Sequence, residues 1–313
     1  LDEEVKERIR NAGLGHILAI SGLHMSIIMV WSFIFIRYLL ALFPSITLNY
    51  DTKRIGAYIS LLIGLFYLMI TGFPVSARRA YIMVAIFFLA IILNRHSSIL
   101  RPVAVAAMII LLFEPEALVS PGFQMSFAAV VGLIGFYEFL RDHYKNKFYE
   151  KPSLSKKIIL YFGGIVLTTI IASLVTSPFA VYHFNQFPKY GIIGNLVGIP
   201  AVTFLVLPFA FLATILMPLG LEVIFLKISE IGVNAIFAVS SYIDGLNNNK
   251  VTIAQFPVYI IAIIAYGWCF FFIFKSNIRY IFLMLVVAGY IGIFTLNIKP
   301  DFIVSEKANL FAV

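Results

Sequence analysis

The sequence predicts an all-α integral membrane protein, a polytopic bundle of about ten transmembrane or re-entrant helices, some of them broken. Hydrophobic residues make up 61% of its 313 residues and charged residues only 12%. The mean hydropathy of +0.98 is too high for one water-soluble globule. The hydrophobic residues also gather into runs of membrane-spanning length, which indicates where the helices lie.

About ten apolar runs are long enough to cross, or nearly cross, the bilayer. They cover residues 16–43, 55–71, 79–93, 102–113, 121–140, 158–176, 191–217, 223–243, 257–274 and 279–297. The run at 102–113 is short for a full crossing, whereas the first and seventh runs are long. Some of these helices should therefore be tilted, broken or re-entrant.

Basic residues between the runs predict the orientation. The segment RDHYKNKFYEKPSLSKK, between the fifth and sixth runs, carries six lysines and arginines and is the strongest cytoplasmic signal. Alternation from this segment places Lys53 and Arg54 inside and both ends of the chain on the outer face. Arg78 and Arg79 conflict with the rule that basic residues gather on the cytoplasmic side, because they fall on the outer side.

The two ends predict a segment of a longer protein. The first residue is Leu, and the last residues, KPDFIVSEKANLFAV, begin to alternate between apolar and polar as in a strand. We therefore expect an outer-face lead-in at 1–15, a transmembrane domain at 16–298 and the start of a further region at 299–313. The charged opening LDEEVKERIRNAGLG is unlike a secretory signal.

Four polar clusters interrupt the apolar runs, and the first is GHILAISGLHM. It places His16, Ser21 and His24 in a run that would otherwise face hydrocarbon, which penalises unpartnered polar atoms. The glycines around them, among them Gly13 and Gly22, allow close backbone approach or a break in the helix. Two interpretations stay open: the polar side chains bond to neighbouring helices as packing contacts, or they line a hydrated path.

The second cluster is TGFPVSARRAYIM, in which Ser76 is expected to cap the start of a helix. Arg78 and Arg79 then lie in the first turns, where cations oppose the helix macrodipole. An anion should compensate, and a phosphate would gain from both the free N–H groups and the guanidinium groups. The alternatives are an ion pair with Glu114 or Glu116, or contact with lipid headgroups.

The third cluster is SPGFQMSF, with Ser120 as the expected N-cap and Pro121 at the first helical position. Gln124 and Ser126 follow within the first two turns. Because they cannot both face one direction, one of the two is expected to be a packing residue.

The fourth cluster is TSPFAVYHFNQFPKYGIIGNLVGIP. Pro178, Pro188 and Pro200 predict an irregular stretch, which survives in a membrane only where it lines a cavity or is buried in protein. Aromatic, imidazole and amide side chains lie between them, namely Tyr182, His183, Phe184, Asn185, Gln186 and Phe187. This alternation suits stacking and hydrogen bonding to the bases of a single nucleic-acid strand. An ordinary interfacial belt of aromatic residues is the alternative.

The sequence lacks the motifs of several kinds of enzyme and transporter. The chain has no GxxxxGK[ST] for a nucleotide-driven motor and no HExxH for zinc, and its five histidines are scattered. No acidic residue near Ser21 and His24 would orient an imidazole for hydrolysis. The runs also hold few of the carboxylates that proton or sodium coupling uses. We therefore expect no enzyme activity, no metal and no cofactor.

All four clusters resemble motifs of the ComEC-type competence proteins, inner-membrane channels for DNA uptake during natural transformation. GLGHILAISGLHM resembles the family's Gly followed by HLLAISGLH, and TGFPVSARRAYIM resembles G-x-P-x-S-A-x-R-A. SPGFQMSFAAVVGL resembles D-P-G-F-Q-L-S-F-A-A, with Ser120 where Asp is frequent. YHFNQFPKYGIIGNLVGIP resembles Y-H-F-x-Q-x-S…G-x-x-A-N-L-x-A-x-P. The four motifs follow the family's order and cover most of the chain.

The resemblance implies a channel in the bacterial inner membrane that passes one DNA strand into the cytoplasm. The expected path residues are His16, Ser21, His24, Arg78, Arg79, Gln124, Ser126, His183, Asn185, Gln186 and Asn195. The implied partners are single-stranded DNA, membrane lipid, an outer-face DNA receptor and a cytoplasmic ATPase or helicase.

The family's membrane domain sits between an OB-like domain and a metallo-β-lactamase-like domain. The sequence contains neither, so no nuclease activity carries over. The alternative function is a secondary transporter for a small anionic solute, with broken helices and with Arg78 and Arg79 at its binding site.

Overall fold

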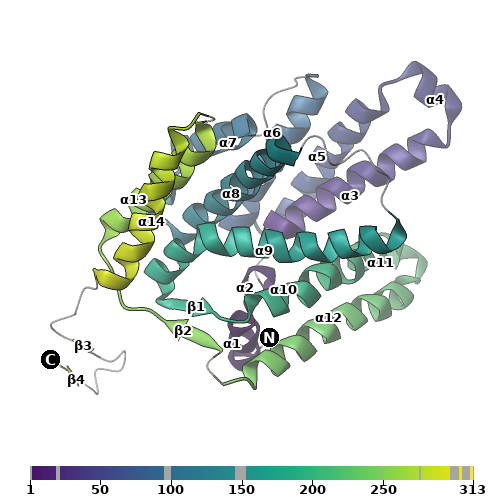
Figure 1. The fold of residues 1–313 in the computed structure, drawn as a ribbon. Helices are drawn as coiled ribbons and strands as arrows, with labels where there is room; N and C mark the ends of the chain where they lie inside the picture. Colours follow the sequence, from purple (N-terminus) through teal and green to yellow (C-terminus); the bar gives the residue numbers. More distant parts are fainter. Residues whose placement is uncertain are drawn as a thin grey trace.

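The computed structural model describes residues 2–18, 22–94, 100–144, 153–247, 249–274, 276–296, 303–304 and 311–312. Helices dominate the described chain (Figure 1). The α-helices are α1 (Glu3–Asn11), α2 (Gly15–Leu18), α3 (Gly22–Ala41), α4 (Pro44–Asn49), α5 (Thr52–Ile70), α6 (Val75–Ile92), α7 (Leu100–Phe113), α8 (Pro121–Tyr144), α9 (Leu154–Phe184), α10 (Gly191–Pro200), α11 (Leu207–Leu216), α12 (Glu222–Asp244), α13 (Val258–Ile273) and α14 (Arg279–Thr295). The prediction of an all-α membrane protein is confirmed.

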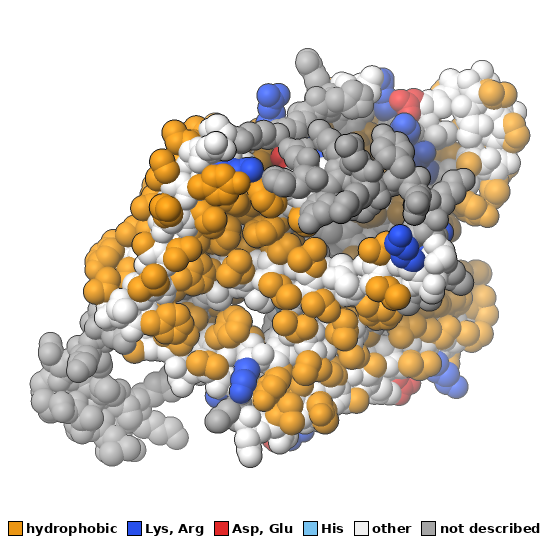
Figure 2. Space-filling model, viewed as in Figure 1, with side chains coloured by type: hydrophobic (Ala, Val, Ile, Leu, Met, Phe, Trp, Pro, Cys, Tyr) orange, Lys and Arg blue, Asp and Glu red, His pale blue; other side chains and the backbone are white. Residues whose placement is uncertain are grey.

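Membrane-spanning length is reached by seven of the described helical segments. The helices α7, α13 and α14 are apolar but shorter, with 14, 16 and 17 residues. Hydrophobic side chains cover most of the face in Figure 2, and lysines and arginines lie mainly toward its upper and lower margins. This surface suits a hydrocarbon solvent, because few charged groups would need burial in lipid.

The helices pack in three neighbouring groups. In the first, α3, α5 and α6 share a core that contains Met25, Met29 and Phe88. Gly64 on α5 makes this packing close, because a Cβ added there would lie 2.7 Å from the sulfur of Met29. The helix α7 and the 3₁₀ turn η1 (Pro115–Val119) connect this group to α8.

The second group contains α8, α9, α13 and α14, and it corrects the prediction that Pro178 breaks a helix. Pro178 lies inside α9, which continues to Phe184. A proline lacks the N–H that would bond to the carbonyl of Leu174 four residues earlier. The hydroxyl of Tyr290 on α14 donates to that carbonyl, and the hydroxyl of Ser177 donates to it at 3.3 Å. The helix persists because these side chains replace the missing donor.

The third group is formed by α10, α11 and α12. Pro200 ends α10 but not the helical path, because the π-helix η2 (Ala201–Val206) connects α10 directly to α11. A π-helix leaves carbonyls imperfectly paired, and the hydroxyl of Ser229 on α12 donates to the carbonyl of Val206 at 3.3 Å. A short 3₁₀ turn, η3 (Met217–Leu219), follows α11.

The expected lead-in at 1–15 contains α1, which packs on the end of α12 through buried Ile9. The carboxylate of Asp244 on α12 accepts from the amide of Asn11 at 3.1 Å and lies 3.7 Å from Nε of Arg8. These contacts fix α1 beside the start of the first polar cluster.

Two short strands, β1 (Gln186–Pro188) and β2 (Lys250–Thr252), form an antiparallel pair that the sequence did not predict. The chain enters β1 through Asn185, which has a φ of 54° and ends α9 in the left-handed conformation. A second pair, β3 (Ile303–Val304) and β4 (Phe311–Ala312), lies in the region where alternation predicted strand structure. In Figure 1, α1, β1 and β2 lie at the lower edge of the bundle and α4 lies at the upper right. The membrane sidedness stays a prediction.

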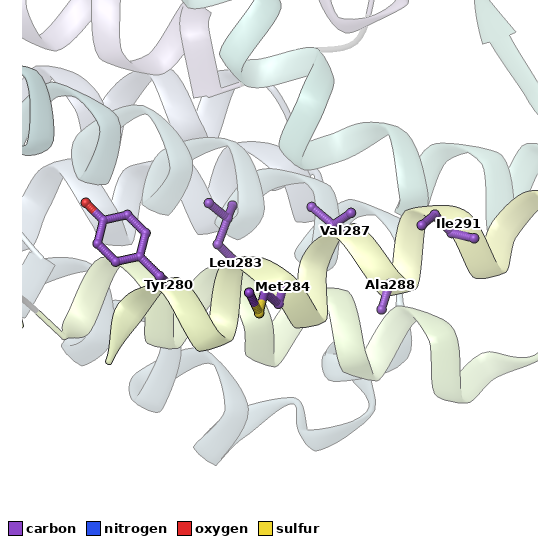
Figure 3. Close-up of a pocket in the computed structure, with 6 residues that line it drawn as sticks. All are labelled: Tyr280, Leu283, Met284, Val287, Ala288 and Ile291. Atoms are coloured by element: carbon purple, nitrogen blue, oxygen red, sulfur yellow. The ribbon is translucent and has the colours of Figure 1, made fainter. Parts of the chain in front are cut away.

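The outer face of α14 carries a shallow apolar hollow of about 410 Å³. Its lining comes from one helix, as Figure 3 shows, and consists of Tyr280, Leu283, Met284, Val287, Ala288 and Ile291. The hollow contains none of the four polar clusters, and its apolar side chains suit contact with lipid.

Candidate functional site

The first and fourth polar clusters meet through glycines. Gly13, at the turn between α1 and α2, has a φ of +76°, and a Cβ added to it would lie 2.6 Å from Cα of Gly191 on α10. A Cβ on Gly194 would collide with the carbonyl oxygen of Ala12, and one on Gly198 would lie 2.7 Å from the side chain of Leu14. The predicted close backbone approach at Gly13 is confirmed. The turn before α2 therefore rests directly on α10.

The polar residues of the first cluster lie beside this contact. The ring of His16 donates a hydrogen bond to the carbonyl of Gly13, and His16 and His24 are close enough to interact electrostatically. The side chain of His16 is exposed and that of His24 is half-buried. Ser21, the third predicted residue, lies outside the described residues.

The first cluster also contacts the second, and the second contacts the third. A Cβ on Gly22 of α3 would lie 3.6 Å from Cβ of Ala80 on α6. The side chain of Arg79, only 8% exposed, extends from α6 to the first turn of α8. A Cβ on Gly122 would lie 2.6 Å from Nη2 of that arginine. Gly122 therefore makes room for the guanidinium group.

Arg78 and Arg79 differ in their partners. Nη1 of Arg78 lies 2.7 Å from Oε1 of Glu114, so the ion-pair alternative holds for Arg78. Nε of Arg79 is buried and has no hydrogen-bond partner among the described residues. The expected N-cap role of Ser76 is wrong, because α6 begins one residue earlier, at Val75, and Pro74 takes the cap position without a side-chain bond.

The third and fourth clusters are joined by a hydrogen bond between side chains. Oε1 of Gln124 on α8 lies 2.8 Å from Nε2 of His183 on α9. The amide nitrogen of Gln124 donates to the carbonyl of Leu118 at 3.0 Å, which leaves its oxygen as the acceptor. Nε2 of His183 must therefore carry the proton. The predicted cap is confirmed, because Oγ of Ser120 accepts from the N–H of Phe123 at 3.3 Å.

These contacts form a closed cycle, in which each cluster touches the next and the fourth touches the first. We call the described residues of the four segments, 12–18 with 22–24, 74–80, 120–126 and 182–195, the polar ring. Its members come from positions far apart in the sequence and from α2, α3, α6, α8, α9 and α10. The cycle lies within a bundle that is otherwise apolar, so it is the candidate site.

The remaining predicted residues have different surroundings within this ring. Asn185 donates to the carbonyl of Ile253 at 3.2 Å, which stabilises the connection into β1. Gln186 is exposed on β1, and Ser126 is half-buried on α8. Oδ1 of Asn195 on α10 is buried without a hydrogen-bond partner among the described residues. The acceptor of Asn195 is therefore unused among the described residues, whereas the amide of Asn185 serves the fold.

Two site residues were missed as such in the sequence. Gly122 lies in the quoted third cluster, but nothing in one sequence indicates that a guanidinium from another helix reaches it. Glu114 was considered only as an alternative partner for the arginines. Its place between α7 and η1, directly opposite Arg78, gives it a part in the electrostatics of the ring.

Comparison with known proteins agrees with this arrangement of motifs. The family model described as Competence protein matches residues 1–277. ComE operon protein 3 of Bacillus subtilis is 26% identical over 220 residues, which cover 70% of the chain and 25% of that protein. Recombination protein 2 of Haemophilus influenzae is 27% identical over 216 residues, or 66% of the chain and 26% of that protein. The chain thus matches about a quarter of the length of these relatives. No solved structure matches it.

Proposed function

The chain belongs to the competence protein family, and from this premise we propose that it forms the passage through which one DNA strand crosses the bacterial inner membrane. The observation that carries the proposal is the polar ring, because it gathers histidine, arginine and amide side chains inside an apolar bundle. Polar groups are costly in hydrocarbon unless they face partners or water. A nucleic-acid strand offers both acceptors and donors to these groups.

The strand would meet complementary groups along the ring. Arg79 attracts phosphates, and guanidinium groups bind them with charge-assisted hydrogen bonds. Oδ1 of Asn195, which has no hydrogen-bond partner among the described residues, would accept a hydrogen bond from an amino group on a base edge. The side chains of His16 on α2 and His24 on α3 add donors and acceptors from the first cluster, which rests on α10.

Passage requires the ring to open. Gly13 and Gly191 are in direct contact, so no strand fits between α2 and α10 in this arrangement. We infer that the turn before α2 separates from α10 when DNA enters. This opening withdraws Ala12 and Leu14 from Gly194 and Gly198, the glycines of α10 on which they pack.

The driving force must come from outside the chain. Moving each phosphate inward against a negative-inside potential costs about 2.3 kcal/mol per 100 mV. A cytoplasmic ATPase, helicase or strand-binding protein would supply this energy. The basic segment around 141–157 is the proposed docking face, although the same lysines also serve orientation.

The test is to replace Arg79 by Gln in the native host and to follow labelled DNA. Internalised single-stranded DNA should fall strongly while DNA bound at the cell surface is unchanged. Arg54→Gln is the control, because Arg54 is an exposed arginine paired with Asp51 at 3.2 Å, far from the ring in sequence. Internalised DNA at the wild-type level in Arg79→Gln would overturn the phosphate role. Loss of uptake of a small anion instead of DNA would favour the transporter alternative.

A further inference from the structure

The environment of Arg79 is positive from three directions. Its guanidinium group ends at Gly122, in the first turn of α8, where the N–H of Gly122 and the helix macrodipole add positive potential. Arg79 also lies in the second turn of its own helix, α6. Arg78 repels it from the neighbouring position. A buried cation in such a place needs an anion, since burying unpaired charge is strongly unfavourable.

The described residues around Arg79 provide less negative charge than this cluster needs. Glu114 attracts Arg79, but its carboxylate is bonded to Arg78 at 2.7 Å. Two guanidinium groups therefore share one carboxylate. The side chain of Arg79 is only 8% exposed. Its Nε is buried and has no hydrogen-bond partner among the described residues, so this donor is unused.

The first turn of α8 adds a second donor. Pro121 has no N–H, and the N–H groups of Phe123 and Gln124 bond to Ser120. Among the described residues, this leaves the N–H of Gly122 without a partner, on the residue against which the guanidinium group of Arg79 packs. A helix N-terminus and an arginine that meet in this way form a phosphate-binding arrangement.

We propose that one phosphate group binds to the guanidinium of Arg79 at the place where it packs beside the first turn of α8, with Glu114 as the carboxylate that competes with it. The proposal rests on the proposed function for the source of the phosphate, a DNA strand. Gly122 is the positioning residue, since any side chain there would push the guanidinium away. Glu114 keeps Arg78 neutralised and lowers the affinity for anions, so that a passing phosphate is released again.

The experiment uses the purified protein in detergent, with inorganic phosphate as the probe. Thermal unfolding is followed while phosphate replaces chloride at constant ionic strength. The wild type should show a saturable rise in Tm. Arg79→Gln should raise the half-saturating phosphate concentration about tenfold or more, because it removes charge-assisted hydrogen bonds. Gly122→Ala should do the same without any change in charge.

Two further variants make the result specific. Glu114→Gln should lower the half-saturating concentration, an opposite shift that a merely misfolded protein would not give. Gly163→Ala is the control for glycine replacement, since a Cβ there meets nothing within 4 Å, and it should titrate like the wild type. If Arg79→Gln titrates like the wild type, or if Glu114→Gln weakens binding, the site is wrong.

A competition experiment separates the two sources of phosphate. A single-stranded oligothymidylate should displace inorganic phosphate, whereas phosphatidylglycerol in mixed micelles should not. Displacement by the lipid alone would overturn the assignment to DNA and make this a lipid headgroup site. Failure of the proposed function can be told apart from failure of the phosphate site. If phosphate binding depends on Arg79 while Arg79→Gln cells take up DNA normally, the phosphate site is retained and the DNA path is rejected.

Discussion

Gln124 and His183 form a direct hydrogen bond, 2.8 Å between Oε1 and Nε2, that ties the start of α8 to the end of α9 and closes the polar ring. The two residues are 59 positions apart in the sequence. Because the amide of Gln124 also donates to the carbonyl of Leu118, the side chain is held at both ends. This bond therefore fixes the relative position of the third and fourth clusters.

The coupling between these residues is measurable. Gln124→Leu and His183→Leu should each destabilise the protein, and the double variant should cost less than the sum. We expect an interaction energy of about 1 kcal/mol, typical of a partly buried hydrogen bond. The interaction energy is obtained from a double-mutant cycle, in which the unfolding of the wild type, the two single variants and the double variant is measured in detergent. Strict additivity would show that the bond does not join the two helices.

The contact of Gly13 with Gly191 predicts a difference between two glycine replacements. Gly13→Ala and Gly220→Ala both place a side chain at positive φ, at +76° and +68°, and that conformation costs each roughly 1 kcal/mol. Only Gly13 also faces a neighbouring backbone, whereas Gly220 meets nothing within 4 Å. Gly13→Ala should therefore lower the free energy of unfolding by at least about 1 kcal/mol more than Gly220→Ala does, because the added methyl group overpacks this contact. Equal losses in unfolding measurements would contradict the contact.

The bond between Tyr290 and the carbonyl of Leu174 predicts a rescue. Tyr290→Phe removes one of the two hydroxyl donors to the Leu174 carbonyl, which lacks its usual backbone donor because of Pro178, at a cost of about 1 kcal/mol. Pro178→Ala restores a backbone N–H four residues beyond Leu174. In that background, Tyr290→Phe should cost much less. An unchanged cost in both backgrounds, measured by unfolding in detergent, would show that the hydroxyl has another role.

The anchoring of α1 depends on Asp244. Its carboxylate accepts from Asn11 and Asn249, at 3.1 and 3.2 Å, and lies 3.7 Å from Arg8. Asp244→Ala should release α1 and speed proteolytic cleavage between α1 and α2 roughly fivefold, as expected for a loss of about 1 kcal/mol.

A matched control for this release is Glu3→Ala. Glu3 pairs with Lys6 at 2.6 Å within α1 itself, so its loss leaves the docking of α1 on α12 intact. Its cleavage rate should stay at the wild-type value. Equal acceleration by both replacements would mean that cleavage reports on the stability of α1 and not on its attachment.

The apolar helices could be read from sequence because their runs are long and uninterrupted. The run predicted at 223–243 is α12, Glu222–Asp244, and the run predicted at 279–297 is α14, Arg279–Thr295. Hydrophobic length determines such segments locally, without knowledge of their neighbours. The cap at Ser120 was predictable for the same reason, since an N-cap acts within one turn.

The errors arose where a distant partner decided the local structure. Pro178 stays helical because Tyr290 supplies a donor to the carbonyl of Leu174, 116 residues from it in the sequence. The π-helix at 201–206 is accompanied by the hydroxyl of Ser229, on the next helix. Proline alone indicates a break, and no feature of the surrounding sequence reveals the compensating group.

The candidate site was predictable in its parts but not in its connections. The residue types of the four clusters stand out against the apolar runs, and so do glycines such as Gly13 and Gly22. Which of them touch follows only from the packing, as the contact of Arg79 with Gly122 shows. Asn185 and Asn195 are both amides in the fourth cluster, yet of the two only Asn195 has a buried acceptor without a partner among the described residues.

Photo-crosslinking of DNA in transit tests the polar ring as a passage most directly. In a Cys269→Ser background, which removes the one cysteine of this sequence, Asn195→Cys carries a benzophenone probe inside the ring, and Met284→Cys carries the same probe on the outer hollow of α14. Illumination during uptake should link labelled single-stranded DNA to the probe at position 195 and leave the probe at position 284 unlinked. DNA linked at position 284 but not at position 195 would contradict a strand path through the ring.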